Sequence, residues 1–265
     1  MNRIGVFGAN GRMGLALIEA AHQNNHTELS AAYVRSSSPL LNIAVNQLNS
    51  AAPATINFSD ERHVDNIDVL IDFTLAAGMR EHLKIAVAQN IPMVIGTTGL
   101  NNDDMQLLQA AAKQIPIVFA RNYSVGVNLL LNLVQTAATK FGDDLDIEIF
   151  EAHHRHKIDA PSGTALAIGE AIADAKGWVH DEVAVFDRSR IEKEKSQNEI
   201  GYSVLRGGDI VGEHTAYFAT SGERLELTHK ASSRMTFALG AVRAAAWLKN
   251  KPAGLYDMQD VLDLK

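Results

Sequence analysis

Short apolar runs alternate with longer helical stretches over the first half of the chain. The runs RIGVFGA, LSAAYV, NIDVLIDFT, PMVIGTT and PIVFARN are predicted strands, and helices are predicted at 12–24, 79–89 and 102–114. Strands rich in Val and Ile that alternate with helices are typical of a parallel sheet covered on both faces. The pattern therefore predicts an α/β fold with a Rossmann-type, doubly wound parallel sheet. Residues 36–55 are expected to form a loop with a short helix.

The pattern changes after an apolar helix predicted at 127–139. DIEIFEAHHRHK alternates as a strand does, LAIGEAIADA is helical, and residues 202–230 contain successive strands separated by Gly turns. This predicts an α+β region with an antiparallel or mixed sheet. MTFALGAVRAAAWLKN is a strong amphipathic helix of the kind that covers a parallel sheet, and LYDMQDVLDL predicts a short last helix. We expect domains at 1–125 and 126–235, with 236–265 returning to the first.

Composition and charge narrow the classes of function. The net charge of -7 argues against a nucleic-acid surface, which needs clustered Lys and Arg. No apolar run approaches the roughly 18 residues that span a bilayer, so no membrane partner is expected. The absence of Cys excludes disulfides, thiolate zinc sites and cysteine nucleophiles. A strand beginning at residue 3 leaves no room for a signal peptide, and we expect a cytoplasmic protein.

Three glycines lie between the first predicted strand and the first predicted helix. Gly8, Gly11 and Gly14 give the spacing G-x-x-G-x-x-G, a variant of the dinucleotide-binding fingerprint. Glycine permits positive φ and lets backbone N–H groups approach a pyrophosphate at the positive end of a helix. The strand before and the helix after favour a bound dinucleotide over the alternative, a tight turn without a ligand.

The end of the second predicted strand bears on cofactor choice. An Asp or Glu there usually accepts hydrogen bonds from the adenosine ribose, but this chain has Val34 and then Arg35. Arg35, and also Arg12, could pair with a 2′-phosphate. We therefore expect NADPH to bind at least as well as NADH; the alternative for Arg35 is a solvated loop residue. The ends of later strands, at 95–99 and 119–128, are expected at the same crevice.

The segment EAHHRHKIDAPSGTA, residues 151–165, concentrates titratable groups. Strand alternation puts Glu151 and His153 on the same face as the apolar positions before them, so both should end inside a cleft. An imidazole beside a carboxylate suits proton transfer. A metal site is not expected, because His154 and His156 have no third ligand at metal-site spacing. A purely structural role remains the main alternative for His156.

The second half of this segment resembles the start of a helix. Ser162 or Thr164 is expected to cap it, and the N–H groups of its first turn can hold an anion. Lys157 lies just before it in the sequence. Since the phosphates of a cofactor are assigned to the first glycine motif, this second anion site predicts an acidic substrate.

The whole pattern resembles the 4-hydroxy-tetrahydrodipicolinate reductase (dihydrodipicolinate reductase) family. The resemblance rests on EAHHRHKIDAPSGTA and, in the same order along nearly the whole chain, on GANGRMG, IDFT, IGTTG, ARNYSVGVN, RGGDIVGEHT and HKASSR. It implies an oxidoreductase of lysine and diaminopimelate biosynthesis. Such an enzyme transfers a hydride from NADPH or NADH to a cyclic dicarboxylate, with loss of water. It also implies a homotetramer assembled through the sheets of the substrate domains.

The resemblance assigns roles residue by residue. It implies that His153 is the proton donor/acceptor and Lys157 a proton donor, and that His154, Gly163 and Thr164 contact the substrate. The residues that match the family's NAD(P)-binding segments are Gly8, Ala9, Asn10, Gly11, Arg12, Met13, Arg35, Gly96, Thr97, Thr98, Ala120, Arg121, Asn122 and Tyr123. Where many members have an acid before the arginine, this chain has Val34, which removes an acceptor for the ribose hydroxyls.

Two other classes of protein share parts of this pattern. One is a different two-domain NAD(P) oxidoreductase, such as a semialdehyde or 2-hydroxy-acid dehydrogenase. The absence of Cys excludes the thioester-forming aldehyde type, and a monoacid substrate does not explain the anion site beside Lys157. The other is a nucleotide sensor without catalysis, which would need no cluster of His and Lys at that site. Turnover of a cyclic dicarboxylate separates these alternatives.

Overall fold

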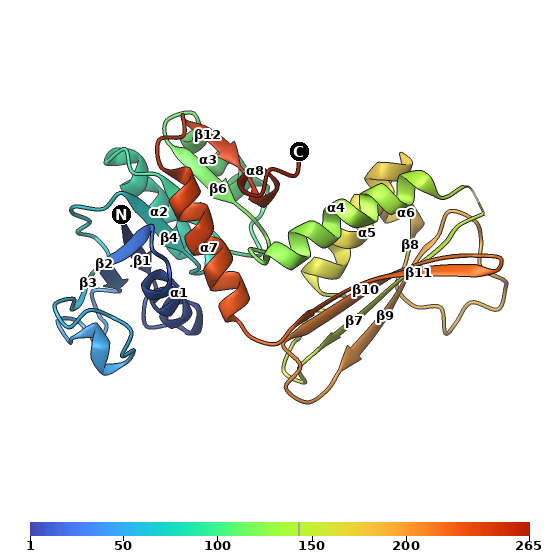
Figure 1. Ribbon diagram of the computed structural model, residues 1–265, viewed down its shortest axis with the longest axis horizontal. Coiled ribbons are helices and arrows are strands. Elements are labelled where there is room, and N and C mark those ends of the chain that lie inside the picture. The colour runs from blue at the N-terminus through green and yellow to red at the C-terminus, as the bar shows by residue number, and fades with distance from the viewer. Residues whose placement is uncertain (143) are drawn as a thin grey trace. The chain divides into compact units, whose positions relative to one another are not determined.

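The chain folds into two units in the computed structural model, which describes residues 1–142 and 144–265 (Figure 1). The first unit contains Met1–Val125 and Arg234–Lys265, and the second contains Gly126–Ser233. The helix predicted to cover the parallel sheet therefore lies in the same unit as that sheet. Among the described residues, no helix is both long and apolar enough to cross a membrane.

The first unit is built on a parallel sheet of seven strands in the order β12-β6-β5-β4-β1-β2-β3. The strands are β1 (Asn2–Phe7), β2 (Thr27–Val34), β3 (Phe58–Asp60), β4 (Val69–Asp72), β5 (Met93–Ile95), β6 (Pro116–Phe119) and β12 (Gly254–Tyr256). From β1 the order runs one way through β2 and β3 and the other way through β4, β5 and β6. This reversal between β1 and β4 is the switch point at which doubly wound sheets bind ligands. The predicted doubly wound parallel sheet is confirmed.

Helices cover both faces of this sheet (Figure 1). They are α1 (Arg12–Gln23), α2 (Ala76–Ala88), α3 (Asn102–Ala112), α7 (Met235–Leu248) and the short α8 (Met258–Val261), with a 3-10 turn at Val45–Gln47. Side chains of β4 alternate between two cores: Val69 and Ile71 join the core of α1 and α7, whereas Leu70 joins that of α2 and α3. Burial on both faces explains why the strands are continuously apolar.

The last segment, residues 255–264, was predicted to form one short helix, but the structure has a strand and a helix there. Its first residues form β12, which pairs in parallel with β6 at the edge of the sheet. Helix α8 begins only after Asp257, whose side chain accepts hydrogen bonds from the N–H groups of Gln259 and Asp260. Pairing with a strand more than a hundred residues away in the sequence is a tertiary interaction, so the local pattern of LYDMQDVLDL did not reveal it.

The second unit contains a mixed sheet of five strands in the order β11-β10-β7-β9-β8. The strands are β7 (Asp146–His153), β8 (Ala184–Val185), β9 (Ile200–Arg206), β10 (Gly212–Thr220) and β11 (Glu223–Ala231), and the helices are α4 (Val125–Lys140), α5 (Gly163–Lys176) and α6 (His180–Val183). β10 runs antiparallel to both β7 and β11, whereas β7, β9 and β8 are mutually parallel. The predicted mixed sheet is confirmed.

Helices α4 and α5 lie side by side on one face of this sheet (Figure 1). Ile147 and Ile149 of β7 pack with Val134 of α4 and Ile168 of α5 in a single apolar core. Because side chains alternate along a strand, the residues that follow at the same parity, Glu151 and His153, also face the helices. The apolar face of β7 therefore leads directly to the first turn of α5.

Candidate active site

A buried carboxylate, that of Glu151, lies at the centre of the candidate site. Its side chain is fully buried. Arg206 of β9 donates to both of its oxygens, from Nη1 at 2.7 Å and from Nη2 at 2.8 Å. The backbone N–H of Ser162 donates to Oε1 at 2.9 Å. A two-pronged guanidinium and a backbone N–H at these distances satisfy a carboxylate that has been removed from water.

These partners keep Glu151 ionised. Burial alone raises the pKa of a carboxyl group, because it disfavours the charged form. The hydrogen bonds from His153, Arg206 and the Ser162 N–H outweigh that effect and lower the pKa of Glu151 to about 2. At neutral pH the site therefore contains a fixed negative charge.

His153 takes its orientation from this charge. Its Nδ1 lies 2.7 Å from Oε2 of Glu151. An ionised carboxylate only accepts hydrogen bonds, so Nδ1 carries a proton and Nε2 is the nitrogen available for proton exchange. Gly212 of β10 lies beside Nε2, where a Cβ would approach that nitrogen to 3.0 Å. The lack of a side chain at Gly212 therefore keeps the reactive side of the imidazole open, and His153 retains 11% side-chain exposure.

Ser162 joins the site to α5. Its Oγ accepts a hydrogen bond from the N–H of Ala165, which caps the helix, and lies 2.9 Å from Nε2 of His214. Strand pairing places His214 directly opposite Glu151. Burial, and then repulsion by His153, lowers the pKa of His214 to about 3. His214 is therefore neutral at physiological pH. The imidazole that bonds directly to the Glu151 carboxylate is that of His153.

The first turn of α5 faces open space. The first helical hydrogen bond runs from the N–H of Leu166 to the carbonyl of Ser162, so the N–H groups of Gly163 and Thr164 precede the helical ladder. A Cβ added at Gly163 would meet no atom within 4 Å. An anion can therefore approach the Gly163 N–H, and the positive end of the helix dipole favours it.

The loop between β7 and α5 carries the remaining predicted residues. The Lys157 ammonium lies 2.8 Å from Oδ1 of Asp159. Arg206 donates to the carbonyl oxygens of Lys157 at 3.3 Å and Asp159 at 2.5 Å, so the arginine that holds Glu151 also fastens this loop. The rings of His154 and His156 lie 6.1 Å apart, and His156 is exposed. In the part of the chain that the structure describes, no three His, Asp or Glu residues could hold a metal ion.

The glycine motif forms a tight turn between β1 and α1. Gly8 has φ of 63°, which favours glycine, and its carbonyl accepts a hydrogen bond from the N–H of Gly11 at 2.9 Å. A Cβ at Gly14 would lie only 2.4 Å from the Gly8 carbonyl oxygen and 2.6 Å from Cα of Ala9. The turn is therefore packed so closely on the helix that only glycine fits, as in a loop that cradles phosphates.

A hollow of about 590 Å³ opens beside this turn. Four of the predicted cofactor residues line it: Gly8, Asn10, Gly11 and Arg35. Ala9 is buried beneath the turn, Arg12 is exposed and Met13 packs partly on the core. The lining also includes an acid and a histidine that the sequence did not single out, Glu61 and His82.

The other predicted cofactor residues follow β5 and β6. The N–H of Gly96 donates to the Asp72 carbonyl at 2.8 Å, and a Cβ at Gly96 would lie 2.2 Å from the Phe73 ring. Thr97 is buried and Thr98 exposed. After β6, Ala120 is buried and Arg121 is exposed, whereas Asn122 is half-buried and bonds through its side chain to the Ser124 N–H. Each of these segments begins at the carboxyl end of its strand, the edge at which α/β sheets bind ligands.

The Tyr123 side chain has a structural role. Its hydroxyl donates to the backbone, lying 2.9 Å from the carbonyl oxygen of Ile95 and 3.0 Å from that of Val118. Burial raises its pKa well above the ordinary value. Gly240 of α7 packs on its backbone, where a Cβ would approach the Tyr123 carbonyl oxygen to 1.8 Å. Tyr123 therefore fixes the segment after β6 to the sheet and to α7.

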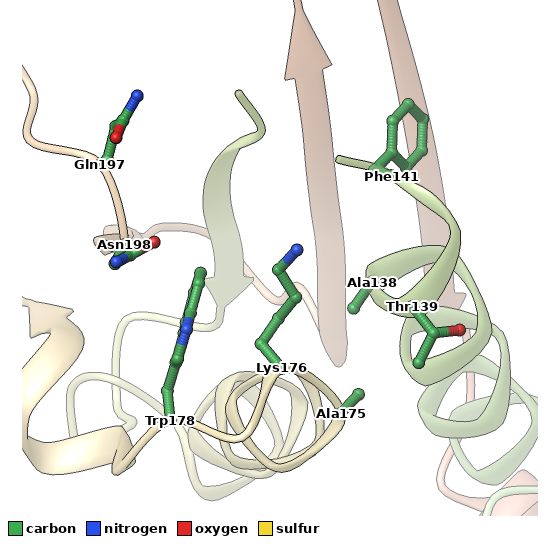
Figure 2. Close-up of a pocket in the computed structure, with 8 residues that line it drawn as sticks. All are labelled: Ala138, Thr139, Phe141, Ala175, Lys176, Trp178, Gln197 and Asn198. Atoms are coloured by element: carbon green, nitrogen blue, oxygen red, sulfur yellow. The ribbon is translucent and has the colours of Figure 1, made fainter. Parts of the chain in front are cut away.

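Another hollow, of about 710 Å³, lies at the far end of α5 (Figure 2). Its lining residues are Ala138, Thr139, Phe141, Ala175, Lys176, Trp178, Gln197 and Asn198. Because α5 has 14 residues and an α-helix rises about 1.5 Å per residue, this end lies roughly 20 Å from Gly163. None of the predicted site residues lines this hollow, so it is separate from the Glu151 cluster.

Comparison with protein families agrees with both halves of this geometry. Residues 2–123 match the family described as dihydrodipicolinate reductase, N-terminus, and residues 126–262 match dihydrodipicolinate reductase, C-terminus. The chain belongs to the dihydrodipicolinate reductase family. Membership confirms the predicted resemblance and the predicted class of enzyme, an oxidoreductase that uses a nicotinamide cofactor and a small substrate.

Curated relatives match along the whole chain. The chain is 82% identical over 264 residues to the 4-hydroxy-tetrahydrodipicolinate reductase of Pseudoalteromonas translucida, covering 100% of this chain and 99% of the relative. It is 56% identical over 268 residues to the enzyme of the same name from Pseudomonas fluorescens, covering 100% of both.

Solved structures confirm the fold. A dipicolinate-bound dihydrodipicolinate reductase from Paenisporosarcina sp. TG-14 superposes with a TM-score of 0.76 at 23% identity, covering 98% of each chain. GenD2 from gentamicin A biosynthesis, in complex with NAD, superposes with a TM-score of 0.63 at 11% identity, covering 100% of this chain and 91% of the other. At these identities the likeness establishes the architecture alone.

Four functional candidates escaped sequence reasoning. Arg206 and His214 reach the site only because β9 and β10 pair with β7, which sets His153 opposite Arg206 and Glu151 opposite His214. Polar residues at the ends of these strands were a signal of a site. The register that aligns them with β7, however, is set by tertiary pairing and not by the local sequence. Glu61 directly follows β3 and His82 lies in α2, and nothing in their own segments marks them.

The charge of Glu151 predicts a specific dependence of stability on pH. Its pKa is lower in the folded protein than the ordinary 4.5, so the ionised group stabilises the fold above about pH 4.5, and this contribution is lost as pH falls toward 2. We expect Glu151→Gln to lower the free energy of unfolding at pH 7 by about 2–3 kcal/mol. In urea denaturation, the difference in the free energy of unfolding between wild type and Glu151→Gln should become smaller as the solution is acidified.

The matched control is Glu213→Gln. Glu213 forms a partly exposed ion pair with Lys230 at 3.1 Å, and such pairs contribute at most about 1 kcal/mol. If the difference in the free energy of unfolding between wild type and Glu151→Gln stayed constant down to pH 3, the charge of Glu151 would not be the source of this stability.

Proposed function

We propose that this protein reduces 4-hydroxy-tetrahydrodipicolinate to tetrahydrodipicolinate, with loss of water, using NADPH or NADH in lysine and diaminopimelate biosynthesis. The observation that carries the proposal is the buried Glu151–His153 pair beside the open N-terminus of α5. It combines a proton-transfer group with a site for a carboxylate. The curated relatives, of which one is 82% identical over the full chain, support the named substrate.

The first turn of α5 is the proposed site for a substrate carboxylate. The N–H groups of Gly163 and Thr164, with the Thr164 hydroxyl, hold it against the positive end of the helix. The Lys157 ammonium, which lies 2.8 Å from Asp159 in the structure, exchanges that partner for the dianionic substrate. His154, on the same loop, contacts the substrate as well.

His153 is the proposed proton donor. Loss of the 4-hydroxyl group as water would convert the substrate to a conjugated imine, and a bound nicotinamide cofactor would supply the hydride for that imine. The resulting enamine-like carbanion would need a proton. Nε2 of His153 delivers it, because Nδ1 is held by Glu151. The fixed charge of Glu151 also stabilises the imidazolium before the transfer. Lys157 contributes positive charge and serves as a second proton donor.

The residues of the first unit fit a dinucleotide. The glycine turn leaves no room for side chains at Gly8 and Gly14, as close approach of a pyrophosphate requires. Thr97 offers a buried hydroxyl that has no hydrogen-bond partner among the described residues. We assign the pyrophosphate to residues 8–13 and the nicotinamide end to residues 96–98 and 120–123. Arg35 is the proposed partner of the 2′-phosphate of NADPH.

The free face of the five-stranded sheet is the proposed surface for a homotetramer. Phe150 of β7 has the opposite parity to the core residues Ile147 and Ile149, so it lies on the face away from α4 and α5. Much of β11 is exposed along its length. Closure of these faces against other copies would bury them.

A coupled assay tests the proposed function. The preceding synthase generates the substrate in situ, and oxidation of NADPH is followed by its absorbance. We expect turnover that requires the synthase and is inhibited by dipicolinate, the ligand named for the Paenisporosarcina relative. Intact binding of cofactor without any turnover would refute the proposal and favour a nucleotide sensor.

His153→Gln should lower kcat by about 100-fold or more, with little change in KM, because it removes the proton donor without removing a substrate contact. Steady-state kinetics in the coupled assay give both constants. The matched control is His156→Gln, which changes an exposed histidine three residues away and should retain wild-type kinetics. Lys157→Ala should impair both kcat and KM. An unaltered kcat in His153→Gln would remove His153 as the donor.

Arg35→Ala should raise the KM for NADPH by about tenfold or more and leave the KM for NADH nearly unchanged. A guanidinium paired with a phosphate contributes on the order of 1.5–3 kcal/mol, and only NADPH has that phosphate. The matched control is Arg243→Ala, which removes an exposed arginine of α7 that does not line the hollow and should leave the KM of both cofactors unchanged. If Arg35→Ala retained its NADPH affinity, the 2′-phosphate would have another partner.

The wild-type protein should sediment as a tetramer in analytical ultracentrifugation, and Phe150→Arg should dissociate it. A charge on the proposed contact face would remain without a partner after assembly. An exposed substitution on α4, Leu133→Arg, controls for added charge. A wild-type monomer at micromolar concentration would overturn the proposed assembly.

A further inference from the structure

An acid does lie beside Arg35, although it follows a different strand, β3. Strand β3 runs parallel to β2 and pairs Val34 with Asp60. The next residue, Glu61, donates its backbone N–H to the Val34 carbonyl oxygen at 3.1 Å. Glu61 is therefore one strand away from the position at which doubly wound folds place their ribose-binding acid.

Glu61 and Arg35 face the same hollow. Both line the 590 Å³ cavity that also contains Gly8 and Gly11 of the glycine turn. The Glu61 side chain is 25% exposed, so its carboxylate is partly open to a ligand. The charged or titratable residues in the lining are Arg35, Glu61 and His82. The cavity therefore contains a basic and an acidic side chain, together with a histidine.

His82 holds Glu61 from within the fold. Its Nε2 lies 3.3 Å from Oε2 of Glu61, and its Nδ1 lies 2.6 Å from Oδ2 of Asp72, which is fully buried. The ring is 3% exposed and stacks on Phe7, with centroids 3.8 Å apart and planes within 2°. A histidine packed so tightly between two carboxylates has a single orientation, and it aims Nε2 at Glu61.

The charge of His82 suits this role. Burial lowers its pKa, but the hydrogen bond and the charge of Asp72, together with Glu61, outweigh burial and raise it. In its protonated form His82 can donate to both carboxylates at once. It also offsets part of the negative charge of Glu61, which would otherwise repel a phosphate group in the same hollow.

We propose that Glu61 accepts the hydrogen bond of the 2′-hydroxyl of the adenosine ribose of NADH and that His82 is the residue that positions it. The inference rests on the proposed function, because it assumes that the hollow holds the adenosine end of a nicotinamide cofactor. Arg35 then serves the 2′-phosphate of NADPH and Glu61 the 2′-hydroxyl of NADH. Two neighbouring side chains of opposite charge give one site the means to hold both cofactors.

Direct binding tests the proposal without turnover. The dissociation constants of NADH, NADPH and the 2′-deoxyadenosine analogue of NADH are measured by cofactor fluorescence on the full-length protein. We expect Glu61→Ala to weaken NADH about tenfold, which corresponds to about 1.4 kcal/mol, and to leave NADPH unchanged or tighter. The deoxy analogue should bind the wild type and Glu61→Ala equally, because it lacks the 2′-hydroxyl that would donate a hydrogen bond to Glu61.

The matched control is Asp60→Asn. Asp60 is the adjacent acid, but its carboxylate pairs with Arg62 and does not line the hollow. It should bind all three nucleotides as the wild type does. His82→Gln should weaken NADH in the wild-type background and add nothing in the Glu61→Ala background, because it acts through Glu61. A role of His82 in folding alone would instead lower the affinity for NADH and NADPH together.

The possible failures are distinguishable. Equal weakening of NADH, NADPH and the deoxy analogue by Glu61→Ala would overturn the assignment of Glu61, as would unchanged NADH affinity. Either result leaves the proposed function intact, provided that the wild type binds NADPH. If the wild-type protein bound none of the three nucleotides, the proposed function itself would fail, and this inference with it.

Discussion

The site depends on one buried negative charge. Glu151 lies at the end of an otherwise apolar strand face, and removal of a carboxylate from water is costly unless every lone pair is satisfied. Arg206, His153 and the Ser162 N–H satisfy it, and each comes from a different segment of the chain. The same interaction orients the imidazole, anchors the loop that carries Lys157 and joins β7 to the start of α5. The chemistry and the local fold therefore share a single cause.

Opposite charges serve recognition in both units. In the second unit, the proposed dicarboxylate would meet the positive end of α5 and the Lys157 ammonium, and His153 is bonded to Glu151. In the first unit, Arg35 and Glu61 share the hollow beside the glycine turn. Each unit thus carries a carboxylate that bonds to a histidine, Glu151 to His153 and Glu61 to His82.

The sequence predicted what local pattern controls. Alternation of strands and helices indicated the parallel sheet, the period of two along β7 placed Glu151 and His153 on the core side, and Ser162 was an expected cap. Features set by strand pairing escaped it. Arg206 and His214 depend on the register of β9 and β10, β12 on a distant partner, and Glu61 on its place beside the end of β2. A local period cannot report which strand lies next to which.

The most direct test of this account is the protonation of His153, observed by nitrogen NMR of protein labelled in its histidines, with His153→Gln for assignment. The account predicts that the neutral imidazole carries its proton on Nδ1, which faces Glu151, and has none on Nε2. It also predicts that Glu151→Gln abolishes this preference for one tautomer. A neutral imidazole with its proton on Nε2 in the wild type, or an unchanged tautomer in Glu151→Gln, would contradict the claim that the buried carboxylate organises the site.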